Sequence, residues 1–76
     1  MNYKEELEYL KEELTNRREK MGLTQYKASL MCGFPTHSGY MYLEKNGNPH
    51  LKNLLRLSKG YKISFEIKDG KLFILD

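Results

Sequence analysis

The stretch THSGYMYLEK, residues 36–45, combines hydrogen-bonding and apolar side chains at a helical spacing. Tyr40 and Leu43 lie three residues apart, which predicts one inward-facing side of a helix. The side chains that then fall on the outward side are His37, Ser38, Met41 and Tyr42. Imidazole and hydroxyl groups donate and accept hydrogen bonds, and methionine and tyrosine offer large apolar surfaces. An outward face of this kind favours contact with a partner, although His37 taken alone is more typical of a solvated or capping residue at a helix start.

A second short helix is expected immediately before this one. Thr24 is a strong N-cap residue, Gly33 is a suitable end, and Phe34-Pro35 predicts an extended turn, because the residue before a proline avoids the helical region. Two helices joined in this way form a helix-turn-helix, whose second helix fits the DNA major groove, about 12 Å wide. The outward side chains of residues 36–45 would hydrogen-bond base edges and pack on thymine methyl groups. None of the four is a long basic residue, so we expect no bidentate arginine–guanine contact.

A longer helix is predicted from about Tyr3 to Met21. Its apolar face is formed by residues three, four and seven apart, which are Leu7, Leu10, Leu14 and Met21, extended by Tyr3. Glutamates gather in its first half and basic residues in its last turns, an order that complements the helix dipole. Gly22 is expected as its left-handed C-cap.

A fourth helix is expected after the stop signal Asn46-Gly47-Asn48. Asn48 is its predicted N-cap, Pro49 suits its first position, and Gly60 is its predicted end. The residues expected to face inward are Leu51, Leu54, Leu55 and Ser58. The chain thus contains four predicted helices before its last segment.

The last segment changes from a helical to an alternating period. Every second residue of KISFEIK, residues 62–68, is apolar, Asp69-Gly70 predicts a type I′ turn, and KLFILD follows as a second strand. That second strand is apolar on both faces, and an uncovered strand of this kind is unstable and prone to pairing. We therefore expect a dimer interface between two copies of the strand, formed by Leu72, Phe73, Ile74 and Leu75.

The composition is that of a small folded domain, with 76 residues, 39% apolar and 30% charged. The single cysteine, Cys32, excludes an internal disulfide and fits a reducing compartment, and no apolar run approaches the roughly 18 residues of a membrane span. We therefore expect a cytoplasmic protein without a membrane contact. His37 and His50 alone predict no metal site, and neither paired carboxylates nor a phosphate loop indicate an enzyme or a cofactor.

Charge is distributed unevenly along the chain. Residues 1–14 carry a net charge of −3, residues 15–62 carry nine lysines and arginines against two glutamates for a net +7, and residues 63–76 carry −1. A basic centre is what contact with a polyanion requires, although a solvated basic surface is a common alternative.

Three segments resemble the Cro/C1-type helix-turn-helix repressors, also called the XRE family. The segments are RREKMGLTQ (17–25), LEKNGNP (43–49) and LKNLLRLSKG (51–60). The resemblance covers about Leu10 to Gly60 and implies a mainly α, four-helix, lambda-repressor-like domain, here with a C-terminal β-hairpin. In that family an arginine late in the first helix pairs with a glutamate at the end of the reading helix. These positions match Arg18 and Glu44.

The resemblance also implies which residues contact DNA. Its base-reading positions map to His37, Ser38 and Tyr42, with Thr36 near phosphate, and a glutamine matching Gln25 helps to hold the DNA backbone. The loop after the reading helix also grips phosphate. The full set expected to contact DNA is Thr24, Gln25, Thr36, His37, Ser38, Met41, Tyr42, Lys45, Asn46 and Asn48.

The chain departs from the family pattern in several places. The segment from Gly33 to Leu43 has one residue more than usual, which leaves the register of the reading positions open by one residue, and Glu44–Pro49 has one fewer. Ala28 stands where a large aliphatic residue is common. The hairpin replaces the usual fifth helix, which resembles Cro itself and the antitoxin repressors that dimerise through C-terminal strands.

These observations predict a helix-turn-helix domain over residues 1–60 and a dimerising β-hairpin over residues 61–76. We expect a homodimeric transcriptional repressor or autorepressor that reads a palindromic double-stranded DNA operator with the helix from about Thr36 to Lys45. The alternative is an antitoxin or another protein-binding module, whose first helix or tail strand docks a partner protein such as a toxin.

Overall fold

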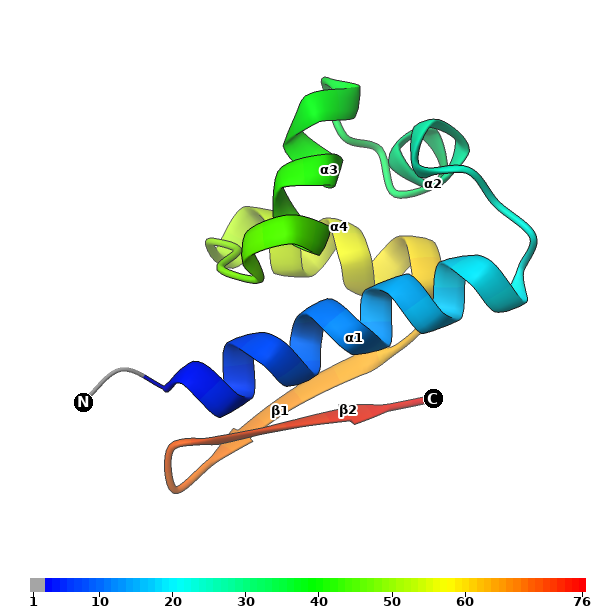
Figure 1. The fold of residues 1–76 in the computed structure, drawn as a ribbon. Helices are drawn as coiled ribbons and strands as arrows, with labels where there is room; N and C mark the ends of the chain where they lie inside the picture. The colour runs from blue at the N-terminus through cyan, green and yellow to red at the C-terminus, as the bar shows by residue number, and fades with distance from the viewer. Residues whose placement is uncertain (1–2) are drawn as a thin grey trace.

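The computed structural model describes residues 3–76 and contains four helices and one β-hairpin (Figure 1). The elements are α1 (Lys4–Lys20), α2 (Gln25–Met31), α3 (His37–Asn46), α4 (Leu51–Tyr61), β1 (Ser64–Lys68) and β2 (Lys71–Leu75). This architecture confirms the predicted mainly α fold with four helices and a C-terminal hairpin. Within residues 3–76, no helix has the length and apolar composition of a membrane span.

The inward side of α1 is formed by Leu10 and Leu14, which are almost fully buried. The predicted apolar face is too long at both ends, since Tyr3 and Met21 are 50% and 51% exposed. Met21 is the C-cap residue, and the chain turns away at Gly22 with the expected positive φ. The helix therefore ends before the side chain of Met21 can join the core.

The two short helices α2 and α3 meet over small and aromatic core residues. Ala28 in α2 and Tyr40 in α3 are both 0% exposed, and Leu43 is 1% exposed, which confirms the predicted inward side of α3. Thr24 caps α2 by accepting a hydrogen bond from the backbone N–H of Lys27 at 3.1 Å, as its N-cap position predicts.

The loop between α3 and α4 runs directly against α1. Gly47 ends α3 with φ +67°, and a Cβ at this position would lie 2.5 Å from the carbonyl oxygen of Leu7. The chain crosses α1 here before it can begin a new helix. The prediction that α4 begins at Pro49 with Asn48 as N-cap is therefore wrong, because α4 begins at Leu51 after His50, which makes no side-chain cap hydrogen bond.

The inward side of α4 also differs from the predicted one. Leu57 is fully buried and Leu54 is half-buried, whereas Leu51 and Leu55 are 71% and 61% exposed. The later start of α4 does not alter the helical spacing of its residues. The prediction therefore differs from the structure in which side of the helix packs on the core. Leu51 and Leu55 were expected inward and instead form an exposed apolar flank.

The end of α4 lies one residue beyond the expected end at Gly60. The helix continues to Tyr61, which is buried, and Lys62 supplies the left-handed C-cap with φ 58°. Gly60 lies inside the helix. A Cβ at this position would lie 2.4 Å from Sγ of Cys32, which explains why the residue is a glycine. A glycine is thus used for close approach between α4 and the end of α2 rather than for stopping the helix.

Burial raises the pKa of the Cys32 thiol to about 11, so this thiol is protonated at neutral pH.

The C-terminal segment forms the predicted hairpin. Lys68 pairs with Lys71 across the turn, and Asp69 and Gly70 have φ values of 53° and 75°, as a type I′ turn requires. Phe65 stands opposite Ile74 in this register. Directly opposed residues share one face of an antiparallel pair, so the hairpin has one face toward the helices and one away from them.

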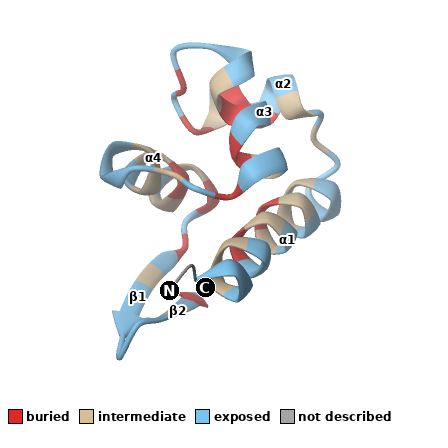
Figure 2. Ribbon diagram, turned by 60° about the vertical axis from the view of Figure 1, so that its left-hand side comes forward, coloured by how far each residue is buried: buried red, intermediate tan, exposed pale blue. Residues whose placement is uncertain are grey.

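The core of the chain itself covers half of the predicted dimer strand. Ile74 is 8% exposed and Leu72 is partly buried against the core, whereas Phe73 and Leu75 point outward and are 44% and 45% exposed (Figure 2). The core of the same chain already covers Ile74, so Ile74 is not available to a second copy, whereas contact of Leu72, Phe73 and Leu75 with a second copy stays a prediction.

We expect Gly47→Ala to lower the free energy of unfolding by about 3 kcal/mol, because it adds a clash with the Leu7 carbonyl to the strain of a positive φ. Gly33→Ala is the matched control, since Gly33 has φ +75° but nothing within 4 Å of an added Cβ. Thermal unfolding followed by circular dichroism measures both. Equal losses in the two variants would show that the loop does not press on α1 as described.

Candidate nucleic-acid interface

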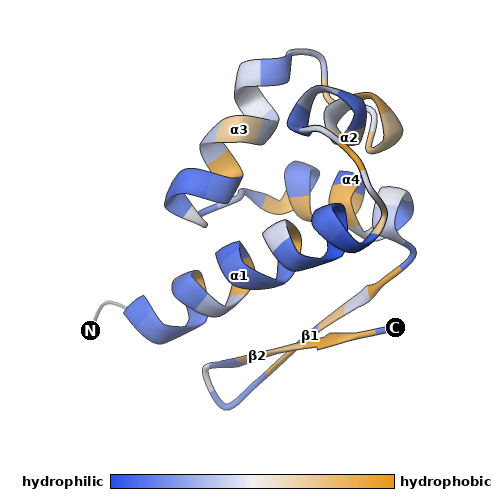
Figure 3. Cartoon of the chain, turned by 45° about the vertical axis from the view of Figure 1, so that its right-hand side comes forward, coloured by the Kyte–Doolittle hydropathy of each residue, from blue (hydrophilic) through white to orange (hydrophobic). Residues whose placement is uncertain are grey.

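The outward side of α3 is open to solvent over its whole length. Met41 is 41% exposed and Tyr42 is 57% exposed, and His37, Ser38 and Lys45 are also exposed. Figure 3 shows that the first turn of α3 is hydrophilic and that apolar positions follow further along the helix. The side chains predicted to face a partner thus lie on one uncovered helix face, opposite the buried Tyr40 and Leu43.

The first turn of α3 is fixed by a cap and by an aromatic contact. Thr36 Oγ1 accepts a hydrogen bond from the backbone N–H of Gly39 at 3.1 Å, so Thr36 is the N-cap. The ring of His37 meets the ring of Tyr26 from α2 edge to face, with centroids 5.6 Å apart and planes at 86°. These contacts restrict the direction of His37 before any partner binds.

The turn between α2 and α3 is anchored by Phe34. The Phe34 side chain is buried, and its ring meets that of Tyr40 edge to face with centroids 5.6 Å apart. The guanidinium of Arg56 in α4 lies 5.7 Å from the centre of the same ring, a cation–π contact. The turn between α2 and α3 is therefore held in place by packing against both α3 and α4.

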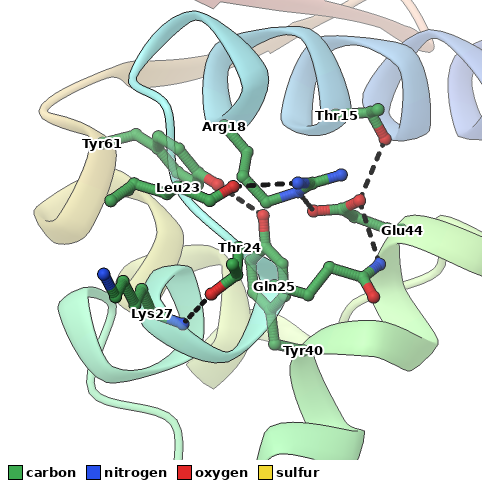
Figure 4. Close-up of polar contacts among 9 residues, drawn as sticks. All are labelled: Thr15, Arg18, Leu23, Thr24, Gln25, Lys27, Tyr40, Glu44 and Tyr61. Carbon is green, nitrogen blue, oxygen red and sulfur yellow. Dashed lines mark hydrogen bonds and ion pairs between the residues drawn. The ribbon is translucent and has the colours of Figure 1, made fainter.

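Glu44, near the end of α3, joins the three N-terminal helices. Its carboxylate accepts a hydrogen bond from Arg18 Nε at 2.8 Å, from Thr15 Oγ1 at 3.2 Å and from Gln25 Nε2 at 3.2 Å (Figure 4). Arg18 also donates from Nη1 to the carbonyl oxygen of Leu23 at 2.9 Å, which ties down the loop between α1 and α2. One carboxylate thus receives donors from α1 and α2 and fixes α3 against both.

The charge of Glu44 is well supported although the side chain is only 5% exposed. Burial by itself disfavours the ionised form, but hydrogen bonds from Arg18, Tyr40 and Gln25 outweigh it and lower the pKa of Glu44 below its ordinary value. The pKa of Arg18 is raised, chiefly by its hydrogen bond to Glu44. The two groups form a mostly buried, fully ionised pair at neutral pH.

Two buried tyrosines extend this polar centre toward α4. The hydroxyl groups of Tyr40 and Tyr61 hydrogen-bond to each other. Burial raises the pKa of Tyr61 to about 12 and raises that of Tyr40 further, so both stay neutral. Tyr40 therefore contributes a large apolar ring to the core and a satisfied hydroxyl to the network around Glu44.

Most residues expected to contact DNA are accessible, and Gln25 is partly engaged within the protein. Its amide nitrogen is engaged with Glu44, and the residue is only partly exposed. One of its two amide N–H groups serves the Arg18–Glu44 centre, so a contact of Gln25 with the DNA backbone stays a prediction. Thr24 is exposed, and its oxygen accepts from Lys27 N, which leaves its hydroxyl proton available.

The loop residues expected to hold phosphate lie in two different settings. Asn46 ends α3 and donates from Nδ2 to the carbonyl oxygen of Tyr42 at 3.2 Å, so part of its donor capacity is used within the helix. Asn48 is exposed in the α3–α4 loop, where it also lines a groove against α1 and the hairpin. Lys45 is the exposed cation on this part of α3.

Sequence patterns did not identify three of the residues that position the site. Tyr26 orients His37, Thr15 supports Glu44, and Tyr61 supports Tyr40. Thr15 lies one turn before Arg18 on α1, a spacing that could have indicated a shared partner. No local signal marks Tyr61, because its contact depends on α4 running past Gly60.

Comparison of the chain with known proteins identifies no relative. No family model, no curated protein and no solved structure matches the chain.

We expect Arg18→Ala to destabilise the fold by about 3 kcal/mol, because it leaves the mostly buried Glu44 carboxylate without its charge partner. The adjacent Arg17→Ala is the control, since Arg17 pairs with Glu13 and with the 83% exposed Asp76 and should contribute under about 1 kcal/mol. Each kcal/mol corresponds to roughly 4–8 °C in the melting temperature of a domain this size. Similar melting temperatures for the two variants would contradict the role given to the pair.

The lowered pKa of Glu44 also predicts a pH dependence. Its ionised form stabilises the fold fully above its ordinary pKa of 4.5, and this contribution is lost as the pH falls through the lower pKa of the folded state. The difference in melting temperature between the native chain and Glu44→Gln should therefore shrink from about pH 6 to about pH 3. A difference that stays constant over this range would mean that Glu44 is not preferentially ionised in the folded protein.

Proposed function

We propose that the protein is a sequence-specific double-stranded DNA-binding regulator that reads the major groove with α3. The observation that carries this proposal is the division of α3 into two sides. Tyr40 and Leu43 are locked into the core, Glu44 is tied to α1 and α2, and the opposite side remains exposed. A helix held this rigidly, with a mixed polar and apolar outer side, is suited to contact with base edges.

Base recognition would involve the exposed residues of the first two turns of α3. His37 and Ser38 can hydrogen-bond base edges, and Met41 and Tyr42 can pack on thymine methyl groups. The edge contact with Tyr26 restricts the orientation of His37, which lowers the conformational entropy lost on binding. The resemblance of about Leu10 to Gly60 to Cro/C1-type repressors supports the same assignment of the reading helix.

Phosphate contacts would come from groups on either side of the reading face. Lys27 in α2 and Lys45 in α3 are both exposed. The hydroxyl groups of Thr24 and Thr36 accept cap hydrogen bonds and keep a proton that can be donated to a phosphate oxygen. The net charge of +7 over residues 15–62 provides the longer-range attraction.

A regulator of this kind would act as a two-fold dimer on a palindromic operator. A single reading helix contacts only a few base pairs, and two helices about 34 Å apart meet successive major grooves on one face of the DNA. Repression would follow from occupation of a promoter. The chain would then need a surface for a second copy that leaves α3 uncovered.

Selection of duplexes from a random pool should yield a palindromic site, to which the protein binds in fluorescence anisotropy. We expect His37→Ala combined with Tyr42→Ala to weaken binding by about 2–5 kcal/mol, because two base contacts are lost. Tyr9→Ala is the control, since Tyr9 is 36% exposed on α1, away from the reading face. Equal affinity of the double variant and the control for the selected site would contradict the assignment of α3.

Lys45→Ala should act differently from the base-reading variants. Loss of one phosphate contact is expected to weaken binding to all sequences alike and to reduce the slope of log K against log salt by about 1. Anisotropy titrations at several salt concentrations measure this slope. An unchanged slope together with a changed sequence preference would place Lys45 among the base-reading residues instead.

A further inference from the structure

One end of the molecule exposes apolar side chains around a groove. The groove has a volume of about 340 Å³ and lies where the first half of α1, the α3–α4 loop, α4 and the hairpin meet. We call it the end groove, and its apolar lining is Leu7, Leu10, Pro49, Leu54, Ile67 and Leu72. Ile67 is 73% exposed although it lies on the inward face of the hairpin, because no part of residues 3–76 covers it.

The exposed flank of α4 continues this apolar surface. Leu51 lies three residues before Leu54 of the groove, and Leu55 lies four residues after Leu51, so the three side chains form neighbouring positions on the helix surface. Leu51 and Leu55 are 71% and 61% exposed. Figure 3 shows hydrophobic colouring on α4 and on both strands. Single exposed leucines are common, but a contiguous apolar surface beside a groove is typical of a protein interface.

The rim of the end groove carries both signs of charge. Glu6 of α1 and Lys71 of β2 both line it. The first half of α1 is acidic, with a net charge of −3 over residues 1–14, and exposed Lys52 and Lys68 flank the α4 and hairpin sides. A rim with an acidic side and a basic side is complementary to itself under two-fold symmetry, whereas a nucleic acid would require a uniformly basic one.

We infer that the end groove and the α4 flank bind a second copy of this chain, with Leu51, Leu55 and Ile67 of each copy buried against the other. The two-fold axis passes beside the groove and brings Glu6 near the partner's Lys71. The expectation of a two-fold dimer rests on the proposed function, but the apolar surface and its charge pattern are independent of it. The interface differs from the β2 pairing predicted from the sequence.

The position of this interface leaves the reading helix free. The groove is formed by the first half of α1, the loop that follows α3 and the tip of the hairpin, which lie together at one end of the molecule (Figure 1). His37, Ser38, Met41 and Tyr42 do not line it. A second copy bound there would stand beside α3 and leave the outward sides of both reading helices uncovered.

The outer face of the hairpin is the competing surface within the chain. Phe73 and Leu75 are 44% and 45% exposed there, which is less than Leu51, Leu55 and Ile67. Neither Phe73 nor Leu75 lines the end groove. The end groove and the α4 flank together combine greater apolar exposure with a concave surface and are therefore the better fit for a second copy.

Sedimentation velocity of the full chain tests the interface directly. The native chain should sediment as a dimer, and Leu51→Glu combined with Leu55→Glu should sediment as a monomer with an unchanged circular dichroism spectrum. Leu30→Glu is the matched control, because Leu30 is 60% exposed on α2 and should leave the dimer intact. A native chain that stays monomeric at every concentration would overturn the inference. So would a dimer that survives both leucine substitutions but is lost with Phe73→Asp.

A charge exchange provides a second test that does not depend on the leucine variants folding. Glu6→Lys and Lys71→Glu should each weaken the dimer at low salt, and the combined variant should restore it, because the partner then carries the opposite sign. Loss of dimer in the combined variant beyond the sum of the single losses would overturn the proposed pairing. A dimer that binds no duplex from the random pool would contradict the proposed function and leave this interface standing.

Discussion

The hydrogen-bonded ion pair between Arg18 and Glu44 is the contact on which the position of α3 depends. Glu44 is almost fully buried, so its charge is tolerated only because donors from α1 and α2 converge on it. The carboxylate lies on the same helix as the exposed residues proposed to read DNA. Any movement of α3 away from α1 would leave a buried charge without its partner. The pair therefore fixes the direction of α3 more than it adds net stability, since desolvation offsets much of the attraction.

The polar centre and the apolar core support each other. Tyr40 presents its ring to Phe34 and its hydroxyl to Tyr61, so one side chain joins the turn of the helix-turn-helix to the end of α4. Arg56 covers the other side of Phe34. The turn, which is one residue longer than in the resembling family, is thereby held from α3 and α4 at once. Rigidity of the turn is what allows a short helix to present its side chains in one direction.

The sequence predicted the features that depend on local signals. The cap at Thr24, the inward side of α3 and the type I′ turn at Asp69-Gly70 all follow from short patterns, and the structure confirms them. The Arg18–Glu44 pair could be expected only through the family resemblance, because the two residues are far apart in the chain.

The features that depend on packing between elements could not be predicted. The start of α4 is delayed because Gly47 presses on α1, and the inward side of α4 is set by that approach and by the contact of Gly60 with Cys32. The partial burial of Leu72 and Ile74 likewise depends on where α1 lies. Local sequence patterns carry no information on such distances between elements.

The central claim is that the exposed side of α3 meets DNA. Nuclear magnetic resonance of the ¹⁵N-labelled chain, titrated with a short DNA duplex taken from selection, tests it most directly. Salt-sensitive shift changes should gather at the amides of residues 36–45 and the start of α2, while the signals of the hairpin tip stay in place. Changes confined to α1 or the hairpin, or none at any duplex concentration, would contradict it.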